Sequence, residues 1–328
     1  MFLWWIRWFP VSKMLFRDIL TAEKFRNAMV IPMLAAAMIS SGEANVVVCG
    51  GMENMSRAPF ALESARFGYR MNNGTLMDTM INDALWDAFG DYHMGMTAEN
   101  VAAKFGITRE MQDKFAVLSQ QKCQKAREAG KFDEEIVPVP IKIKRELVDF
   151  NKDEYPRDNI TEASLSSLKP AFKNDGTVTV GNASGINDGA AAVILISADK
   201  LKELGVKPLA KWVGGSTAGV DPSIMGIGPV ESTKKLLKKL EMSIDEIDLI
   251  EANEAFAAQC LAVGKLLNWD NDKVNINGGA LALGHPVGAS GCRILVSLLY
   301  EMKRRNLKTG LATLCVGGGM GVSTLVKM

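Results

Sequence analysis

Residues 274–327 read VNINGGALALGHPVGASGCRILVSLLYEMKRRNLKTGLATLCVGGGMGVSTLVK, and this stretch decides the fold. Apolar runs at 274–277, 311–315 and 321–327 have the length and composition of strands. Residues 289–305 lie between the first two runs and have the length and pattern of a helix. The stretch therefore predicts a strand, a helix and two further strands, joined by glycine-rich loops.

The same alternation continues upstream of this stretch. A strand is expected near 209–218, followed by a helix whose first turn holds Pro229, a favoured position for proline. A further strand at 247–251 meets a helix beginning near Glu254. Strands that alternate with helices predict an α/β fold built in layers.

The first half of the chain is less regular. Residues 22–41 are expected to form a helix that Pro32 breaks or kinks. The apolar run 46–49 is typical of a strand in a parallel sheet that is covered on both faces. From about residue 55 to 185 the pattern is irregular, apart from a helix expected at 108–129, and this indicates an inserted domain.

Composition excludes several classes of protein. The 328 residues carry a net charge of +1, so no bulk charge attracts nucleic acid or anionic lipid. Five cysteines form no C-x-x-C pair, which argues against a zinc site and for a reducing compartment. The leader MFLWWIRWFPVSK is too short to span a membrane and lacks the marks of a secretory signal. A poorly ordered or non-native leader is the preferred interpretation, with a mitochondrial presequence as the alternative.

Cys315 closes an apolar run and is followed by Val316 and three glycines. Glycines let backbone N–H groups approach a ligand closely, and such groups can stabilise an oxyanion in acyl transfer. A thiol beside them can act as a nucleophile or, as a thiolate, as a base. For the motif alone, an inert buried cysteine in a tight turn is the preferred interpretation.

Imidazole chemistry has two places in this sequence, His93 and His285. His285 stands between Gly284 and Pro286 before a helix, whose N-terminus favours neutral imidazole, although a structural turn is the alternative. Asn253 at a strand–helix junction could hold a water or cap the helix, and Glu254 could serve as an acid or favour the helix N-terminus. His93 alone would be a surface or core histidine.

Taken together, these motifs resemble the thiolases. The stretches that carry the resemblance are NEAFAA at 253–258, GGALALGHPVGASG at 278–291, CVGGGMG at 315–321, GGMENMS at 50–56 and NASGINDG at 182–189. The resemblance runs from about Ala35 to the C-terminus and is closest to the branch that condenses two acetyl-CoA molecules. It implies a layered α/β/α fold of two similar βαβαβ-type halves with an inserted loop domain.

The resemblance also implies a mechanism. In thiolases a first cysteine is acylated, and a second, matching Cys315, takes the α-proton of another acetyl-CoA. His285 matches the residue that activates the first cysteine and binds the thioester oxygen. Asn253 matches the residue that holds the water of that oxyanion hole, and Gly317 matches the backbone donor of a second hole. The CoA thioester is the substrate, and no cofactor or metal is expected.

Further residues fall where the family binds CoA and the acyl group. They are His93, Met94, Ser164, Leu168, Phe172, Ala183, Ser184, Ile186, Met225, Ala255 and Phe256. The expected partners are acetyl-CoA or CoA and either further copies of the chain or a full-length thiolase, without nucleic acid or membrane. A cytoplasmic location is favoured, with the mitochondrion as the alternative.

The chain departs from the family in its first part. The nucleophilic cysteine should lie about two dozen residues before the strand at 46–49, where this chain reads TAEKFRNA at 21–28. The first half is thus expected to be incomplete, its edge strand exposed and acyl-enzyme formation impaired. A non-catalytic CoA-binding or partner subunit is the rival function. The expected divisions are an unmatched leader at 1–34, a remnant of the first half at 35–54, the inserted CoA-binding loop domain at 55–186, the end of the first half at 187–206 and the second half at 207–328.

Overall fold

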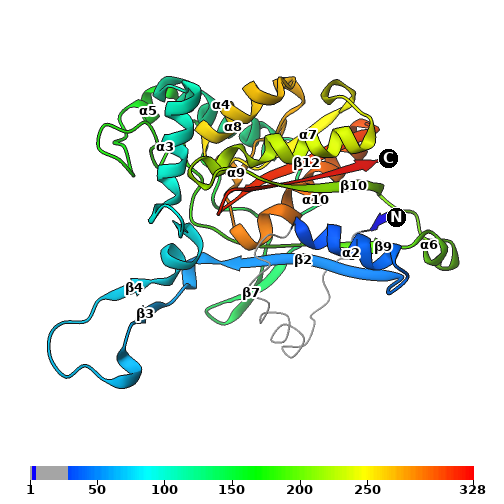
Figure 1. Ribbon diagram of the computed structural model, residues 1–328. Coiled ribbons are helices and arrows are strands. Elements are labelled where there is room, and N and C mark those ends of the chain that lie inside the picture. Colours follow the sequence, from blue (N-terminus) through cyan, green and yellow to red (C-terminus); the bar gives the residue numbers. More distant parts are fainter. Residues whose placement is uncertain (1, 5–28) are drawn as a thin grey trace.

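A seven-stranded sheet forms the centre of the computed structural model, which describes residues 2–4 and 29–328 (Figure 1). The parallel pair is β11 with β12, whereas all other neighbours in this sheet are antiparallel. The strands in spatial order are β11 (Leu249–Ala252), β12 (Thr309–Val316), β13 (Met320–Lys327), β10 (Ala210–Gly219), β1 (Phe2–Trp4), β9 (Asp188–Ile196) and β2 (Val46–Asn54).

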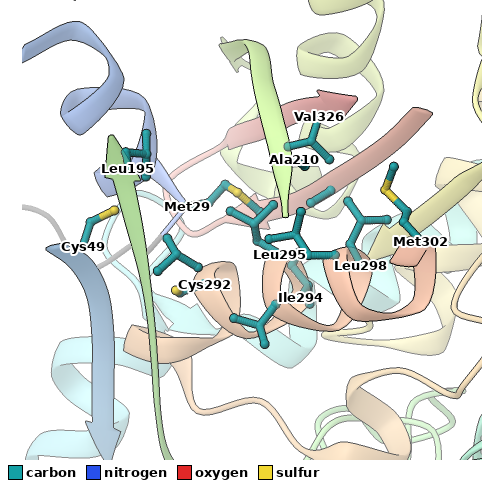
Figure 2. Close-up of a cluster of buried hydrophobic side chains, with 14 of the residues drawn as sticks. Met29, Cys49, Leu195, Ala210, Cys292, Ile294, Leu295, Leu298, Met302 and Val326 are labelled. Carbon is teal, nitrogen blue, oxygen red and sulfur yellow. The ribbon is translucent and has the colours of Figure 1, made fainter. Parts of the chain in front are cut away.

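Helices cover both faces of the second half of the sheet. On one face α10 (Val287–Arg305) and α2 (Val30–Ser40) pack on a core that includes Leu195, Leu295 and Val326 (Figure 2). On the other face α7 (Gly228–Leu240) and α8 (Ala257–Leu267) cover Leu311 and Leu325. Neighbours in β12 and β13 alternate between the two cores, as the period of a strand requires. The predicted layered α/β arrangement is confirmed.

The segment between β2 and β9 forms further helices, two of which, α3 (Met94–Phe105) and α4 (Arg109–Glu128), pack on α8, and three two-stranded hairpins. Helix α4 begins after Thr108, whose side chain accepts a hydrogen bond from the Met111 N–H, so the helix predicted at 108–129 is confirmed. The other elements are η1 (Met55–Arg57), β3 (Phe60–Leu62), η2 (Ala65–Phe67), β4 (Leu76–Asp78), η3 (Ile81–Leu85), β5 (Trp86–Asp87), β6 (Tyr92–His93), β7 (Val139–Ile143), β8 (Glu146–Phe150) and α5 (Glu162–Ser166). Strands β3 and β4 form an arm that projects from the body (Figure 1).

Short elements after β9 complete the fold. They are α6 (Ala198–Leu204), η4 (Pro222–Ile227), η5 (Ile244–Glu246), η6 (Asn271–Lys273) and α9 (Ala280–Leu283). Pro229 lies in the first turn of α7 as predicted. Helix α8 begins at Ala257 rather than near Glu254, because Phe256 has extended backbone angles.

The strand predicted at 274–277 does not form. Val274 makes a single parallel bridge to Ile250, and Asn275 then turns with a φ of +44°. The Asn275 side chain pairs with the end of β11 in place of a strand. Its Oδ1 accepts from the Ala252 N–H and its Nδ2 donates to the Ala252 carbonyl oxygen, both at 2.8 Å. A side chain thus replaces the backbone pairing that the apolar pattern predicted.

Two expectations for the first half are corrected. Pro32 does not break a helix, since α2 begins at Val30 and places Pro32 in its first turn, where the backbone N–H needs no helical partner. Residues 22–28 of that predicted helix lie outside the described residues. The strand at 46–49 is the start of β2, which is antiparallel to β9 and not covered on both faces, because the Val48 side chain is 62% exposed. Among the described strands β2 ends the sheet, as the predicted open edge requires.

Candidate active site

His285 lies in the turn between α9 and α10. Gly284 has a φ of +85°, and a Cβ there would lie 2.3 Å from the Asn187 side chain, so only glycine fits this close approach. Asn187 in turn accepts a hydrogen bond from the His285 backbone N–H at 3.0 Å. The turn thus fixes the backbone of His285 from the end of the inserted segment.

Both ring nitrogens of His285 have partners. Nδ1 lies 2.6 Å from the Ser290 Oγ, which donates its own proton to the Pro286 carbonyl oxygen at 2.9 Å. With its proton so placed, the Ser290 Oγ is the acceptor for Nδ1, and this arrangement corresponds to the tautomer that carries the ring proton on Nδ1. Nε2 keeps a lone pair, and the Asn253 amide Nδ2 lies 3.2 Å from it.

Asn253 follows β11 directly, and its backbone N–H donates to the Thr313 carbonyl oxygen on β12. Its side chain does not cap α8, so the alternative of a capping residue is wrong. The Nδ2 atom faces His285, while the Oδ1 atom is buried and has no hydrogen-bond partner among the described residues. A buried acceptor without a partner costs stability, which makes Oδ1 a candidate contact for water or ligand.

Burial lowers the pKa of His285 from 6.5 to about 4, and the positive charge of Arg293 adds to this effect. The imidazole is therefore neutral at physiological pH. This agrees with the prediction of a neutral histidine, although burial rather than the helix N-terminus is the main cause.

Cys315 lies near the end of β12, 7% exposed, opposite Gly321 on β13. Burial raises the pKa of its thiol to about 12, so the thiol carries its proton at neutral pH. The turn that follows needs glycine, because Gly318 and Gly319 have positive φ and a Cβ at Gly319 would lie 2.3 Å from the Val220 carbonyl oxygen. A Cβ at Gly317 would press on the end of the Met94 side chain, at 2.8 Å.

An apolar cluster surrounds Cys315 and brings together most of the predicted binding residues. It contains Met94, Ala183, Met225, Ala255 and Phe256, with Phe172 packed against it. The His93 ring stacks on Phe172 with centroids 4.7 Å apart, and both the N–H and Oγ of Ser184 donate to the Ala255 carbonyl oxygen at 3.0 Å.

Three predicted binding residues lie outside this cluster. Ser164 is exposed and forms the capping box of α5 with Thr161. Leu168 packs instead against the cluster around Leu165, and Ile186 is 58% exposed.

His93 has a structural role that the sequence did not indicate. Its Nδ1 accepts a hydrogen bond from the Gly95 N–H and so caps α3, and burial lowers its pKa. The ring therefore holds the start of the helix that carries Met94.

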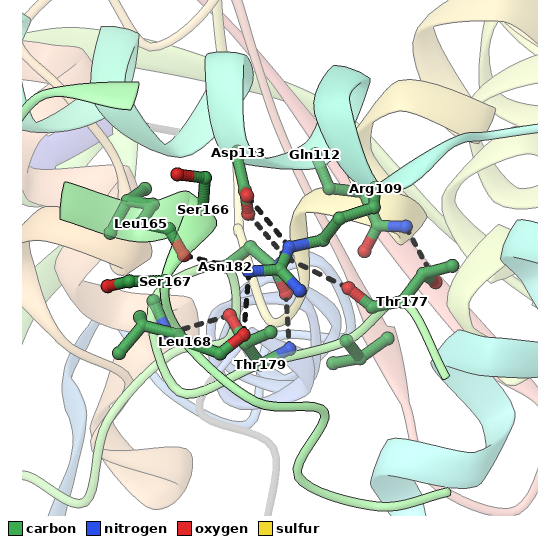
Figure 3. A network of polar contacts seen from close by, with 12 residues as sticks. Arg109, Gln112, Asp113, Leu165, Ser166, Ser167, Leu168, Thr177, Thr179 and Asn182 are labelled. Atoms are coloured by element: carbon green, nitrogen blue, oxygen red, sulfur yellow. Dashed lines mark hydrogen bonds and ion pairs between the residues drawn. The ribbon is translucent and has the colours of Figure 1, made fainter. Parts of the chain in front are cut away.

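A polar network on α4 also went unrecognised in the sequence (Figure 3). The Arg109 Nη2 donates to the carbonyl oxygens of Leu165 and Leu168 at 2.7 and 3.0 Å, and its Nε pairs with Asp113 at 2.7 Å. Asp113 accepts from the Asn182 Nδ2 at 2.9 Å. The i, i+4 spacing of Arg109 and Asp113 was the available signal. The network fixes α5 and the 182–186 segment to one helix.

The remaining cysteines have no setting that activates a thiol. Cys49, Cys123, Cys260 and Cys292 are all buried, and burial raises the pKa of each thiol. All five cysteines of the sequence lie within the described residues, and each is free.

Two features are absent from residues 2–4 and 29–328. No three His, Cys, Asp or Glu side chains in this part of the chain gather as a metal site would require. Each helix in the same ranges is too short or too polar to cross a membrane.

Comparison with known proteins gives a consistent result. Residues 28–199 match the family model of the thiolase N-terminal domain and residues 206–328 that of the thiolase C-terminal domain. The acetyl-CoA acetyltransferase of Cupriavidus necator is 59% identical over 296 residues, which are 90% of this chain and 75% of that protein. The enzyme of the same name from Pseudomonas aeruginosa is 58% identical over 88% of this chain and 74% of its own length.

Solved structures agree with the sequence relatives. The acetyl-CoA acetyltransferase of Bacillus anthracis superposes with a TM-score of 0.89 at 51% identity, covering 92% of this chain and 76% of its own. Human mitochondrial 3-ketoacyl-CoA thiolase in complex with CoA gives a TM-score of 0.84 at 46% identity, covering 89% and 73%.

Proposed function

This chain belongs to the thiolase family of acyltransferases, and we propose that it is an acetyl-CoA C-acetyltransferase by lineage whose acyl-enzyme step is impaired. The reaction of the lineage joins two acetyl-CoA molecules into acetoacetyl-CoA and free CoA, and thiolysis is the reverse. The proposed retained functions are thioester binding and movement of the α-proton.

The observation that carries this proposal is the Asn253–His285 pair. A neutral imidazole with its lone pair on Nε2 stands 3.2 Å from an amide whose Oδ1 has no protein partner among the described residues. A water bound by Oδ1 would direct its other proton toward a thioester oxygen, where negative charge develops as the α-proton leaves.

Cys315 is the proposed base. Its thiolate would take a proton from the acetyl methyl group, leaving an enolate whose oxygen the Asn253-bound water stabilises. Burial raises the pKa of this thiol to about 12, which makes the thiolate scarce but strongly basic. Gly317 is proposed to stabilise the second oxyanion through its backbone N–H, since glycine adds no side chain of its own beside that group.

The apolar cluster around Phe172 and Phe256 is the proposed site for the acyl group and pantetheine arm. Apolar walls with a few polar groups are typical of such slots. The solved complex of a relative with CoA supports this assignment. Within it, Met94, Ala183, Met225 and Ala255 are proposed to contact the acyl end, and His93 and Ser184 the amides, while Ser164, Leu168 and Ile186 would lie along the outer CoA path.

Acyl transfer needs a thiol that gives its proton to His285 Nε2 and then carries the acetyl group. No cysteine occurs in the segment 21–28, and the four cysteines other than Cys315 are buried with raised pKa. Without that proton Nε2 remains an acceptor and cannot donate to an oxyanion. The Claisen step therefore lacks its acyl donor within this chain.

A non-catalytic CoA-binding or partner subunit is the second candidate function. The edge of β2 among the described strands favours it, because Val46 and Val48 are 44% and 62% exposed on this strand, whose first charged residue is Glu53. Such a strand edge can pair with another chain, either a further copy or a full-length thiolase. For the compartment we propose the cytoplasm, supported by five free cysteines, with the mitochondrion as the alternative.

Radiolabelled acetyl-CoA tests both proposals with the chain as it exists. The expected result is saturable binding, displaced by unlabelled CoA, without protein-bound label after denaturation. A denaturation-resistant acetyl adduct would overturn the impaired acyl step, and absence of binding would overturn the CoA-thioester function itself.

A further inference from the structure

Glu254, next to Asn253, has no place in the proton-transfer scheme above, and its carboxylate is directed away from that chemistry. The side chain is 1% exposed, and three groups donate hydrogen bonds to it. Ser119 Oγ donates to Oε2 at 2.7 Å, Leu281 N–H to Oε2 at 3.1 Å, and Asn275 Nδ2 to Oε1 at 2.8 Å. It is therefore neither a free acid nor a residue that favours the N-terminus of α8, the two alternatives that its position in the sequence allowed.

The three donors come from three separate parts of the fold. Ser119 lies on α4 of the inserted segment, Leu281 lies on α9, and Asn275 lies in the turn that replaces a strand. Asn275 also bonds to both backbone groups of Ala252, the residue before Asn253. One carboxylate thus joins the end of β11 to the helix that leads into His285.

The glycines before α9 leave the space that this carboxylate and α4 occupy. A Cβ at Gly279 would lie 2.2 Å from Glu254 Cδ, and the Gly279 N–H donates to Ser119 Oγ at 3.0 Å. A Cβ at Gly278 would lie 2.6 Å from the Ser119 carbonyl oxygen. Any side chain at these two positions would separate α9 from Glu254 and α4.

We propose that Glu254 is a positioning residue that holds Asn253 and His285 at their mutual distance by tying α4, α9 and the Asn275 turn to the end of β11. The proposal rests on the function proposed above for that pair. Asn253 is its direct chain neighbour, and α9 ends one residue before Gly284, so both partners depend on the same carboxylate. Burial raises the pKa of Glu254, whereas the three donors oppose this shift by favouring the carboxylate.

The test uses the ligand-free protein, so that its outcome does not depend on catalysis. The chain has two histidines, and NMR of the imidazole groups resolves both across a pH titration, with His93→Asn identifying the His285 signal. In Glu254→Gln an amide NH2 meets the donors of Ser119 or Leu281. The contact of Asn253 with Nε2 and the packing of α9 against residue 254 should then loosen. The pKa of His285 should rise by about half a unit or more toward 6.5.

Ser119→Ala is the second variant, because it removes one donor without placing a new group beside the carboxylate. It should shift the His285 titration in the same direction by a smaller amount. Leu267→Ala, at the last residue of α8 in the core that α7 and α8 share, is the matched control, since it destabilises the fold at a position outside this network. It should lower the melting temperature and leave the titration of His285 unchanged.

The proposal is overturned if both Glu254→Gln and Ser119→Ala fold and His285 titrates in them as in the native chain. It is also overturned if Leu267→Ala shifts the titration as much as they do. Failure of acetyl-CoA binding would instead contradict the proposed function. The NMR results would still decide whether Glu254 positions Asn253 and His285, because they are measured without ligand.

Discussion

The Nδ1 atom of His285 lies 2.6 Å from the Oγ of Ser290, one turn into α10, and that hydroxyl donates its proton to the Pro286 carbonyl oxygen. This arrangement assigns the ring proton to Nδ1 and directs the Nε2 lone pair at Asn253. The reactive side of the imidazole is thus set by a serine five residues along the chain, on the helix that follows.

Ser290→Ala should remove the preference of His285 for the Nδ1–H tautomer. The buried Nδ1–H would lose its acceptor, at a cost of about 1–3 kcal/mol in the free energy of unfolding. The fraction of the Nε2–H tautomer, read from imidazole 15N chemical shifts, should rise. Ser297→Ala is the matched control, because it removes another hydroxyl of α10, which donates to Glu135 at 3.2 Å. An unchanged tautomer in Ser290→Ala would contradict the assignment.

The neutral state of His285 should make stability depend on pH. Its pKa is about 4 in the folded chain and 6.5 in the reference state, so between these values the unfolded state binds more protons. The free energy of unfolding contributed by this residue should therefore fall by about 3 kcal/mol as pH drops from 6.5 to 4.

This contribution must be measured as the difference between the native chain and His285→Asn. Burial raises the pKa of Glu135 to about 7 and that of Glu251 to about 8, so these groups stabilise the folded chain at low pH and lose that contribution as pH rises. Their slope opposes that of His285. Urea titrations that give the same pH profile for both chains would exclude the predicted effect.

Arg109 should matter for CoA-thioester affinity without being part of the slot. Arg109→Met removes the donors to Leu165 and Leu168 and the partner of Asp113, so α5 and Asn182 should loosen. We expect the Kd for acetyl-CoA to rise about tenfold, or about 1.4 kcal/mol.

The control for this change lies on the same helix. Arg127 pairs with Asp158 at 2.9 Å, but both side chains are substantially exposed, at 35% and 48%, so Arg127→Met should change affinity little. Equal effects of the two substitutions in calorimetric titrations would show that the network does not support the slot.

Local signals in the sequence predicted the candidate site residues but not the residues that hold them in place. A thiol before glycines, a histidine between glycine and proline, and an amide at a strand end were each readable, and the structure brings His285 and Asn253 into contact. The support comes from contacts distant in sequence. Ser119 and Glu254 are 135 residues apart, and no periodicity connects them.

Errors in the predicted elements arose where side chains or position overrode local pattern. Asn275 replaced a predicted strand by bonding to the Ala252 backbone. Pro32 is compatible with a helix because it lies in the first turn of α2. The helix predicted from residue 22 placed Pro32 in the helix interior instead, where proline would break or kink it. The apolar run of β2 indicated burial on both faces, yet β2 ends the sheet, because strand order is decided by tertiary pairing.

The most direct test of the central claim is deuterium exchange at the acetyl methyl group of acetyl-CoA in D2O. Removal of an α-proton by Cys315 and its return from solvent needs no acyl-enzyme, so this chain should catalyse exchange, faster as pH rises because burial raises the pKa of the thiol to about 12. Mass spectrometry of recovered acetyl-CoA should show label with the native chain and with Cys49→Ala, and none above the uncatalysed rate with Cys315→Ala. Exchange that persists in Cys315→Ala, or that is absent in the native chain, would contradict a proton-moving half-site centred on Cys315.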